Sequence, residues 1–447
     1  MSGHIEQRVR EAGIVGAGGA GFPTHVKVAS TVDTVIANGA ECEPLLRCDK
    51  AVMRARGDRV LTGLRLLAEA TGAKRAVLAL KGHYADVVEE VRQAAWRVFP
   101  EAEIHTLDNY YPAGDEQVLV TEVTGRVIPE GGIPLQVGVV VNNVITLAQL
   151  ADAVEQGKPV TRRVLTVGGE VARPLTCELP VGTSMADAVA RAGGATVPRW
   201  VIVEGGPMMG RVVTDPTEPI TKKTSGVIVL SADHPMVLRK QITTKREATL
   251  AHATCCQCRM CTDLCPRFNL GHRIEPHLTM CVLLAQGLAE PPPEHVASAF
   301  LCCLCGVCEV MACPLHLSPR RVYEQLRADL FAAKQQNPLR NEDCTPNPFH
   351  KQRRIPLPRL ISRLGLDDYL RAPDLVEWDP GDVRAVRIPL SQHTGAPALP
   401  VVALGQRVVE GDLIGEIPEG KLGARVHASI AGTVTKINER EIRIEVS

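Results

Sequence analysis

The N-terminal third of the chain combines helical spacing of apolar residues with short, continuous apolar runs. Residues Ile5 to Ala12 place apolar side chains at helical intervals, and Thr34 to Ala37 form the kind of run that a buried strand shows. Polar residues follow that run at once, in the sequence Asn38-Gly39-Ala40-Glu41-Cys42-Glu43-Pro44. Because α/β sheets bind ligands beyond the carboxyl ends of their strands, the pattern predicts a ligand site there.

After the N-terminal third, the pattern of apolar residues predicts mainly short strands in two further segments of the chain. Apolar runs at Val164–Val167 and Val201–Glu204 predict strands and Ser184–Ala192 predicts a helix, so we expect a small β-rich module in the middle. A glycine-rich turn after it contains Met208 and Met209, for which we expect a packing role. Residues 384–447 alternate apolar and polar positions between glycine turns, which predicts a small β-barrel or sandwich.

Residues 335–380 differ from both neighbouring segments because prolines and arginines are scattered through them. This composition is typical of a wrapping segment or linker. We expect its charges, including those of Arg353, Arg354, Arg359 and Arg363, to form a solvated face.

Length and charge narrow the class of protein. A chain of 447 residues is expected to hold three or four domains. Lys and Arg total 50, as do Asp and Glu, so no strongly basic face is implied and nucleic-acid binding is disfavoured. No apolar run approaches the roughly 18 residues of a membrane helix, and the N-terminus lacks an export signal. We expect a soluble protein in a reducing, cytoplasmic compartment.

Two cysteine runs carry the clearest chemistry. They are Cys255-x2-Cys258-x2-Cys261-x3-Cys265-Pro266 and Cys302-x2-Cys305-x2-Cys308-x4-Cys313-Pro314. The first matches the bacterial [4Fe–4S] pattern and the second departs from it by one residue before Cys313. In two-cluster ferredoxins the fourth cysteine of each run binds the other cluster. The predicted ligands are therefore Cys255, Cys258, Cys261 and Cys313 for cluster one, and Cys302, Cys305, Cys308 and Cys265 for cluster two.

Two other uses of these cysteines stay open. Paired C-x2-C sequences also bind zinc, although zinc sites rarely need four cysteines in such a run. Disulfides are disfavoured in a chain with 15 cysteines and no export signal. Cys256 and Cys303 lie beside first ligands and are expected to be bystanders.

A glycine-rich stretch near the N-terminus predicts a phosphate site. It reads Gly16-Ala17-Gly18-Gly19-Ala20-Gly21-Phe22-Pro23-Thr24, with Lys27 beyond. Glycines at this density allow close backbone approach to a ligand, and their free N–H groups suit a phosphate.

This stretch and the segment from Asn38 to Pro44 resemble the flavin-binding subunit of respiratory complex I and the RnfC component of the Rnf electron-transport complex. Two later segments, Tyr111 to Glu116 and Val141 to Thr146, resemble later flavin-contacting stretches of that fold. The resemblance implies an FMN site in which the phosphate contacts are Gly16, Gly18, Gly19 and Lys27. The ribityl chain and ring would be held by Asn38, Glu43, Asn142, Asn143 and Thr146.

The same resemblance implies NADH contacts at Phe22, Glu43 and Glu116. Two positions depart from the complex I pattern, since Ala17 stands where the complex I protein has arginine and Ala40 where it has aspartate. These departures leave the flavin and nicotinamide geometry open.

The segment after the flavin domain resembles the soluble-ligand-binding β-grasp (SLBB) module of the same families. The C-terminal segment resembles the barrel-sandwich module of RnfC proteins, which usually lies at the N-terminus there. The expected fold is therefore α+β and multidomain. Its parts are an α/β flavin domain at 1–155, an SLBB β-grasp module at 160–235, a helical two-[4Fe–4S] ferredoxin domain at 245–335, a linker at 336–383 and a barrel-sandwich domain at 384–447.

This domain order resembles that of the cobalamin reductases of propanediol-utilisation microcompartments. The resemblance implies that NADH reduces FMN, and that single electrons pass through two [4Fe–4S] clusters to cobalamin, from Co(III) to Co(II) or Co(I). It implies an adenosyltransferase partner, contact with shell proteins and a location inside a microcompartment, and no side-chain acid or base is required. An Rnf-type NADH:ferredoxin electron-transfer protein and a non-enzymatic electron wire or scaffold remain the alternatives.

Overall fold

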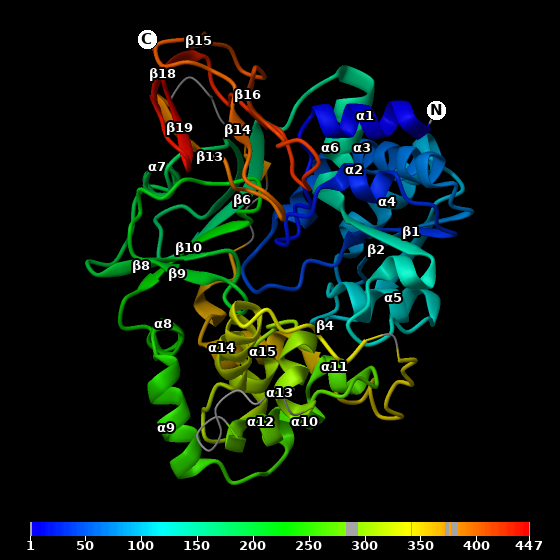
Figure 1. Ribbon diagram of the computed structural model, residues 1–447, viewed down its shortest axis with the longest axis vertical. Helices are drawn as coiled ribbons and strands as arrows, with labels where there is room; N and C mark the ends of the chain where they lie inside the picture. Colours follow the sequence, from blue (N-terminus) through cyan, green and yellow to red (C-terminus); the bar gives the residue numbers. More distant parts are fainter. Residues whose placement is uncertain (1, 283–293, 341, 372–374, 377–382, 447) are drawn as a thin grey trace.

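A computed structural model describes residues 2–282, 294–340, 342–371, 375–376 and 383–446. Met1, Ser447 and parts of the expected ferredoxin and linker segments lie outside the described residues. Figure 1 shows an α/β part formed by the first third of the chain beside a middle β part. The helical part with the two cysteine runs lies below both, and the C-terminal β part lies above the middle part.

The N-terminal part is built on a four-stranded parallel sheet in the order β3-β2-β1-β5. The middle strands β1 and β2 are buried along almost their whole length, because helices cover both faces of the sheet. One core contains residues of α1, α3, α4 and α6, and a second core contains residues of α5. The elements are α1 (Ser2–Glu11), α2 (Thr24–Val28), β1 (Thr34–Gly39), α3 (Cys48–Thr71), β2 (Arg75–Lys81), α4 (Ala85–Val98), β3 (Glu103–Leu107), β4 (Tyr110–Tyr111), α5 (Glu116–Thr124), η1 (Pro134–Val137), β5 (Val139–Asn143) and α6 (Val144–Gln156).

The order of these strands creates a crevice between β1 and β5. From β1 the chain moves outward through β2 to β3, and it then returns to place β5 on the other side of β1. Such a reversal of strand order is where open α/β sheets bind ligands, beyond the carboxyl ends of the strands. Asn38 and Asn143 are paired in register at those ends. The ligand site expected from the sequence therefore lies at the switch point of the sheet.

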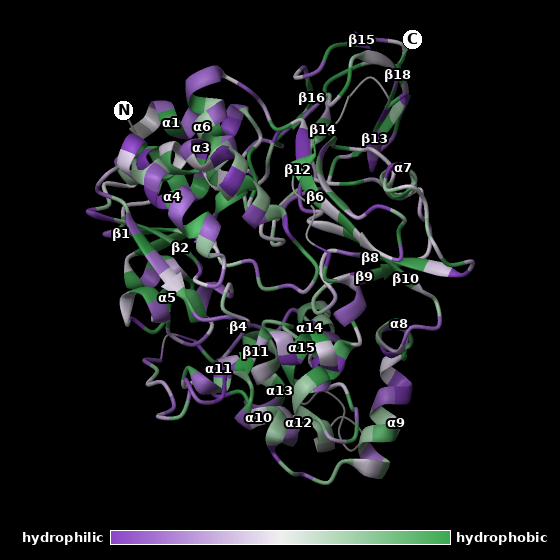
Figure 2. Cartoon of the chain, turned by 180° about the vertical axis from the view of Figure 1, so that it is seen from behind, coloured by the Kyte–Doolittle hydropathy of each residue, from purple (hydrophilic) through white to green (hydrophobic). Residues whose placement is uncertain are grey.

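The middle part is a six-stranded sheet in the order β12-β7-β6-β10-β8-β9, with helix α7 packed on its core. Figure 2 shows hydrophobic residues along β10 and hydrophilic residues on α1 and α4 of the neighbouring part. The elements are β6 (Arg162–Gly169), β7 (Leu175–Pro180), α7 (Met185–Arg191), β8 (Trp200–Glu204), β9 (Arg211–Val213), β10 (Gly226–Ser231), α8 (Pro235–Lys240) and β12 (Leu375–Val376).

The cysteine runs lie in a part made of short helices. These surround a core that includes Cys265 and Tyr323. The elements are α9 (Thr244–Thr254), α10 (Met260–Asp263), α11 (Pro266–Asn269), α12 (Pro276–Val282), α13 (Glu294–Ala297), η2 (Ser298–Leu301), η3 (Cys308–Ala312) and α14 (Pro319–Ala332).

The segment expected to be a solvated linker is instead integrated into the fold. Strand β11 (Ile355–Pro356) pairs with β4 of the flavin part, helix α15 (Leu357–Leu364) buries its leucines, and the short turn η4 (Asp367–Tyr369) follows. The guanidinium group of Arg354 pairs with Asp108 and Glu122, and that of Arg363 donates to the carbonyl of Val310. The expected solvated face is therefore wrong for these arginines, because they bridge separate parts of the chain.

The C-terminal part consists of two small antiparallel sheets around a shared apolar core. Their orders are β13-β19-β18-β15 and β14-β16-β17. The strands are β13 (Ala385–Pro389), β14 (Leu399–Pro400), β15 (Arg407–Val408), β16 (Leu413–Glu416), β17 (Val426–His427), β18 (Gly432–Ile437) and β19 (Glu441–Glu445). No described helix combines the length and the apolar character that crossing a membrane requires.

Close packing of α3 on α6 holds the flavin part together. A Cβ atom added at Gly63 would lie 1.9 Å from the carbonyl oxygen of Leu147, whereas one added at Gly57 would lie 3.4 Å from Ala94. Both glycines lie in α3, so they differ in the space beside them. Only glycine at position 63 allows the two helices this approach.

We therefore expect Gly63→Ala to destabilise the flavin part by about 1–3 kcal/mol, because the added methyl group forces the helices apart. The midpoint of thermal unfolding, followed by circular dichroism, should fall. Gly57→Ala is the matched control and should leave the midpoint unchanged or raise it, since alanine favours helix. Equal midpoints for the two variants would contradict the packing argument.

Candidate functional site: two cysteine groups beside a flavin crevice

The two cysteine runs fold with the same backbone pattern. The second and fourth residues after the first cysteine adopt positive φ in both runs, at Gln257 and Arg259 and at Leu304 and Gly306. Left-handed residues between extended ones turn successive N–H groups toward one side, which makes a concave binding surface. Leu304 N lies 3.4 Å from Cys302 Sγ, and Leu317 N lies 3.3 Å from Cys313 Sγ. Backbone amide groups therefore point at two sulfurs of the second run.

The extra residue of the second run is absorbed by a π-helical turn. Residues 308–312 form this turn, and the N–H of Cys313 donates to the carbonyl of Cys308 at 3.1 Å. Insertion of one residue into a helix commonly produces such a wide turn at functional sites. The x4 spacing therefore does not displace Cys313 from the other sulfurs.

The first cysteine group combines residues from both runs. Cys255, Cys258 and Cys261 line one cavity together with Cys313. Burial, followed by the neighbouring Cys313, Cys258 and Cys255, raises the pKa of the Cys261 thiol to about 12. The structure thus places the last cysteine of the second run with the first three of the first run, as the sequence pattern predicts.

The second cysteine group is the reciprocal set and is more deeply buried. Burial and the nearby Cys303 and Cys302 raise the pKa of Cys265 to about 12. Burial also raises the pKa of the Cys308 thiol, with Cys302 and Cys265 among its charged neighbours, and Cys265 lies near Cys305 in the same way. Cys265 therefore lies with Cys302, Cys305 and Cys308.

These groups fit an iron–sulfur centre. Buried thiols that raise one another's pKa values resist ionisation unless a cationic centre compensates the thiolates. Within the described ranges, no three His, Cys, Asp or Glu side chains are placed to hold a single metal ion. The sulfurs of the first group surround a cavity rather than one point, which suits a cluster of several irons better than zinc.

The glycine loop lies over the crevice of the flavin part. Its ends are joined by a hydrogen bond from Gly16 N to the carbonyl of Phe22, at 2.9 Å. Thr146 Oγ1 accepts from Ala17 N at 2.9 Å, and a Cβ atom on Gly18 would lie 3.8 Å from Asn143. The loop is therefore held against the carboxyl end of β5 and the start of α6.

Polar atoms in this crevice lack partners. Asn142 Nδ2 and Glu41 Oε2 are buried without a hydrogen bond to any described residue. Burial and the neighbouring Asp49 raise the pKa of Glu41 to about 8. Buried polar groups without partners are costly, so a polar ligand that supplies hydrogen bonds would stabilise the crevice. The crevice residues therefore fit FMN.

Other expected FMN contacts are already engaged by protein. Asn143 caps α6 by accepting from Ile145 N, and its Nδ2 donates to both carboxylate oxygens of Asp49 at 3.0 Å. Asn38 Nδ2 donates to the carbonyl of Gly114. These two asparagines shape the crevice walls.

Lys27 and Glu116 are paired with each other. Lys27 Nζ donates to the carbonyl of Val141 at 2.7 Å and to Glu116 Oε1 at 3.1 Å. The structure thus brings an expected phosphate contact together with an expected NADH contact, beside β5. The carbonyl of Phe22 accepts from Gly16 N and so closes the glycine loop.

Glu43 is bound by the middle part. Its carboxylate accepts from Met208 N at 2.9 Å and from Met209 N at 2.8 Å, and a Cβ atom on Gly206 would collide with it. Burial raises the pKa of Glu43 above its ordinary value. Both carboxylate oxygens therefore join the flavin part to the middle part, and the NADH contact expected at Glu43 stays a prediction.

Sequence reasoning missed Arg163, which reaches the glycine loop from strand β6. Its Nη2 donates to the carbonyl of Ala17 at 2.9 Å and its Nε to the carbonyl of Thr224 at 2.7 Å. Arg163 is fully buried, and its Nη1 has no partner within the described residues. The only signal in the sequence is a charged residue beside an apolar strand, because the partner loop lies far away along the chain.

Two contacts join the flavin part to the second cysteine group. Tyr111 Oη donates to the carbonyl of Cys305 at 2.7 Å. Arg267, which lies two residues after Cys265, forms a buried two-point ion pair with Asp115 at 2.6 and 2.9 Å. The second group is thus fastened directly to the loop that precedes α5.

Sequence families match each part of the chain. Residues 9–152 match the Nuo51 FMN-binding domain, residues 164–212 the SLBB domain and residues 254–318 a 4Fe-4S dicluster domain. Residues 381–446 match the RnfC barrel sandwich hybrid domain. The expected multidomain fold is confirmed.

Relatives match over most of the chain. Cobalamin reductase PduS of Salmonella typhimurium is 43% identical over 98% of this chain and 96% of its own length. A component of the Na(+)-translocating ferredoxin:NAD(+) oxidoreductase complex of Acetobacterium woodii is 36% identical over 59% of this chain and 57% of its own. A solved NAD+-reducing [NiFe]-hydrogenase shares the fold with a TM-score of 0.50 at 23% identity, over 75% of this chain and 63% of that one.

Replacement of single cysteines tests the two groups. Cys258→Ala and Cys305→Ala should each remove half of the bound iron, because each deletes a ligand of a different cluster. Cys256→Ala is the matched control and should keep the full iron content, since Cys256 is exposed beside a ligand. Iron and acid-labile sulfide measurements give the result, and full iron in Cys258→Ala would refute the grouping.

Replacement of Arg163 tests its role at the crevice. Arg163→Met should raise the dissociation constant of FMN by about tenfold, the range expected for a lost hydrogen bond to a charged group. Arg162→Met is the control, because Arg162 on the same strand pairs with Glu410 instead. Flavin fluorescence titration measures the affinity, and iron content reports that the chain remains folded. Equal FMN affinity in the two variants would contradict this role.

Proposed function

This chain belongs to the cobalamin reductase PduS family, and we propose that it is an NADH-dependent reductase that passes single electrons to cobalamin. FMN and two [4Fe–4S] clusters are its proposed cofactors. The identity of 43% over nearly the full length of both chains supports the choice of substrate. The observation that carries the electron-transfer function is the direct fastening of the flavin crevice to a four-cysteine group, through Tyr111 and Asp115.

The cofactor pair explains why both sites are needed. When bound, FMN can accept a hydride from NADH and release electrons singly to iron–sulfur clusters. The chain supplies position and environment. The amide groups directed at Cys302 and Cys313 would stabilise charge on the sulfurs, and burial of the second group would tune its potential.

We propose that the second cysteine group receives electrons first. Tyr111 contacts Cys305 of that group, and the ion pair from Asp115 anchors the helix beside Cys265. The first group lies farther along the same part and includes the exposed Cys258. Electrons would therefore move from a buried group near the crevice to one near the surface.

The proposed ligands of the clusters and flavin remain those implied by the sequence, with Arg163 added to the crevice. The domain division at 1–155, 160–235, 245–335, 336–383 and 384–447 is likewise proposed. A corrinoid adenosyltransferase that traps reduced cobalamin, shell-protein contacts and residence in a bacterial microcompartment are carried over from the family.

One observation favours a second candidate, an electron wire that does not use NADH. Glu43, an expected NADH contact, has both carboxylate oxygens bound by Met208 and Met209. Ala17 and Ala40 also depart from the complex I pattern. NADH reactivity distinguishes the two functions.

An anaerobic absorbance experiment tests the proposal. NADH is added to the protein loaded with FMN and iron–sulfur clusters, followed by hydroxocobalamin. We expect NADH to bleach flavin and clusters, and cobalamin then to become Co(II). Bleaching without cobalamin reduction would refute the acceptor and favour a ferredoxin-type partner. Absence of any response to NADH would favour the electron wire.

A further inference from the structure

One buried and two half-buried arginines lie close to the second cysteine group. Arg267 follows Cys265 by two residues in the chain. Arg320 and Arg327 both lie on helix α14, from which Nη1 of Arg327 donates to the carbonyl of Cys302 at 3.0 Å. We call these three arginines the arginine shell. A buried group that gains an electron gains negative charge, so the net charge of this shell affects how easily electrons enter.

Two charges of the arginine shell are compensated by carboxylates. Arg267 forms its buried ion pair with Asp115 at 2.6 and 2.9 Å. Nη1 of Arg320 lies 3.4 Å from Oε1 of Glu309, and Glu309 is itself buried. Because each pair joins opposite charges, these two arginines add little net charge near the sulfurs.

Arg327 differs from the other two because it has no carboxylate partner within the described part of the chain. It donates instead to a backbone carbonyl, which leaves the positive charge of the guanidinium group uncompensated. Burial raises the pKa of the Cys302 thiol, and the nearby charges of Arg327 and Arg267 act against that rise. Arg327 therefore supplies the surplus positive charge of the arginine shell, directly beside a ligand residue.

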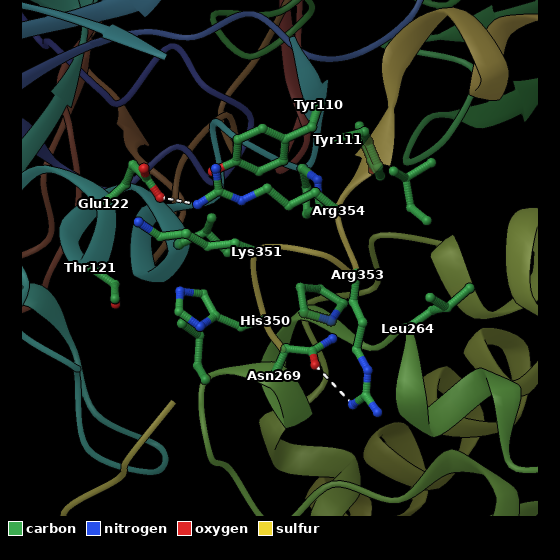
Figure 3. A pocket seen from close by; sticks show the side chains of 15 residues that line it. Tyr110, Tyr111, Thr121, Glu122, Leu264, Asn269, His350, Lys351, Arg353 and Arg354 are labelled. Carbon is green, nitrogen blue, oxygen red and sulfur yellow. Dashed lines mark hydrogen bonds and ion pairs between the residues drawn. The ribbon is translucent and has the colours of Figure 1, made fainter. Parts of the chain in front are cut away.

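Figure 3 shows two further arginines of this region, and carboxylates compensate both of them. Arg353 donates to Asn269 Oδ1 at 3.3 Å and lies 3.5 Å from a carboxylate oxygen of Asp263. Arg354 is paired with Glu122 (Figure 3). Neither arginine adds a surplus charge to the second group.

Two other arginines act on both groups together. Arg239 and Arg363 donate to carbonyls of the π-helical turn at residues 308–312. This turn connects the second group to Cys313 of the first group. Their charges therefore do not distinguish one group from the other, whereas Arg327 contacts a ligand residue of the second group alone.

The first cysteine group has less need of such a charge. Its ligand Cys258 is exposed, so water can stabilise added negative charge there. Arg259, the next residue, lies 3.4 Å from a carboxylate oxygen of Glu275 and 3.8 Å from one of Asp263. The exposed group thus has a compensated arginine and the buried group an uncompensated one.

We propose that Arg327 raises the reduction potential of the second cysteine group, so that this group can accept electrons from the flavin crevice. The inference rests on the proposed clusters and FMN, and not on the identity of the final acceptor. Negative charge added to a buried site is costly unless a nearby cation compensates it. Arg327 supplies that compensation. It is a positioning residue, because it acts through Cys302 and touches no reacting atom.

Redox titration with dithionite, followed by electron paramagnetic resonance, tests this role. In Arg327→Gln the midpoint potential of the second cluster should fall by about 59 mV or more, which is a tenfold change in a one-electron equilibrium. The potential of the first cluster should stay unchanged. Arg327→Lys keeps the charge and should keep the wild-type potential. The Cys258→Ala variant, which should retain the second cluster, identifies its signal.

Lys334→Gln is the matched control. It removes an exposed cation just beyond the end of α14, where water screens the charge, and it should change neither potential. Iron content shows whether each variant still holds both clusters.

Rapid mixing with NADH gives a second measurement. In the loaded wild-type protein, flavin and cluster absorbance should bleach together. In Arg327→Gln the flavin should bleach as before, while the fraction of cluster absorbance that bleaches should fall, because electron entry is about tenfold less favourable. A role in folding alone would not separate the two responses.

Several results would overturn the proposal. These are equal potentials in Arg327→Gln and the wild-type protein, equal shifts of both clusters, or a fall in Arg327→Lys as large as that in Arg327→Gln. If Arg327→Gln loses iron, Arg327→Lys decides: the wild-type potential supports the role of charge, and the same loss of iron refutes it. Failure of the proposed cofactors is distinguishable, because the wild-type protein would then hold no iron and show no resonance signal.

Discussion

The buried ion pair between Asp115 and Arg267 is the contact on which the electron-transfer arrangement depends. Asp115 also caps helix α5 at the flavin crevice, and Arg267 follows the Cys265-Pro266 sequence of the second cysteine group. Loss of one partner would leave a charge buried without compensation, which is far more costly than loss of an exposed pair. A single pair therefore fixes both the start of a flavin-domain helix and the helix beside a cluster ligand. Tyr111 adds a second point of attachment, so the two parts cannot pivot freely about the first.

The middle part has a similar positioning role, although its sequence resembles a ligand-binding module. Glu43 joins the loop after β1 to the turn at Met208 and Met209. In the opposite direction, Arg163 of the middle part donates a hydrogen bond to the carbonyl of Ala17 in the glycine loop of the flavin part. The expected packing role of the methionine turn is thus realised through its backbone N–H groups, while the side chain of Met208 is buried. Through these two contacts the middle part holds the loop after β1 and the glycine loop in place, and these two loops form the walls of the crevice.

The sequence predicted those features that depend on local spacing. The short gaps in each cysteine run, the apolar run of β1 and the glycine turns all produce the expected local structures, because each depends on neighbouring residues. The exchange of Cys265 and Cys313 between groups followed from a known pattern of ligation. The partners of Glu43, Arg163 and Arg354 could not be predicted, since each contact joins residues that are distant in sequence and no local period records it. The π-helical turn before Cys313 was predictable in part. The sequence shows that the second run has one extra residue, but it does not show that a π-helical turn accommodates this residue.

The position of the C-terminal part explains how its order along the chain can change. Thr394 donates to the carbonyls of Ala20 and Gly21 in the glycine loop, both at 2.9 Å. Lys222 of the middle part binds the carbonyls of Gly13 and Arg425, and so joins the start of that loop to the C-terminal part. What the fold requires is this contact in space with the outer side of the loop. A module that docks through side chains and backbone carbonyls can be attached at either end of a chain, provided that it reaches the same loop. Domain order is therefore a weaker guide to function than the contacts which support the crevice and the cysteine groups.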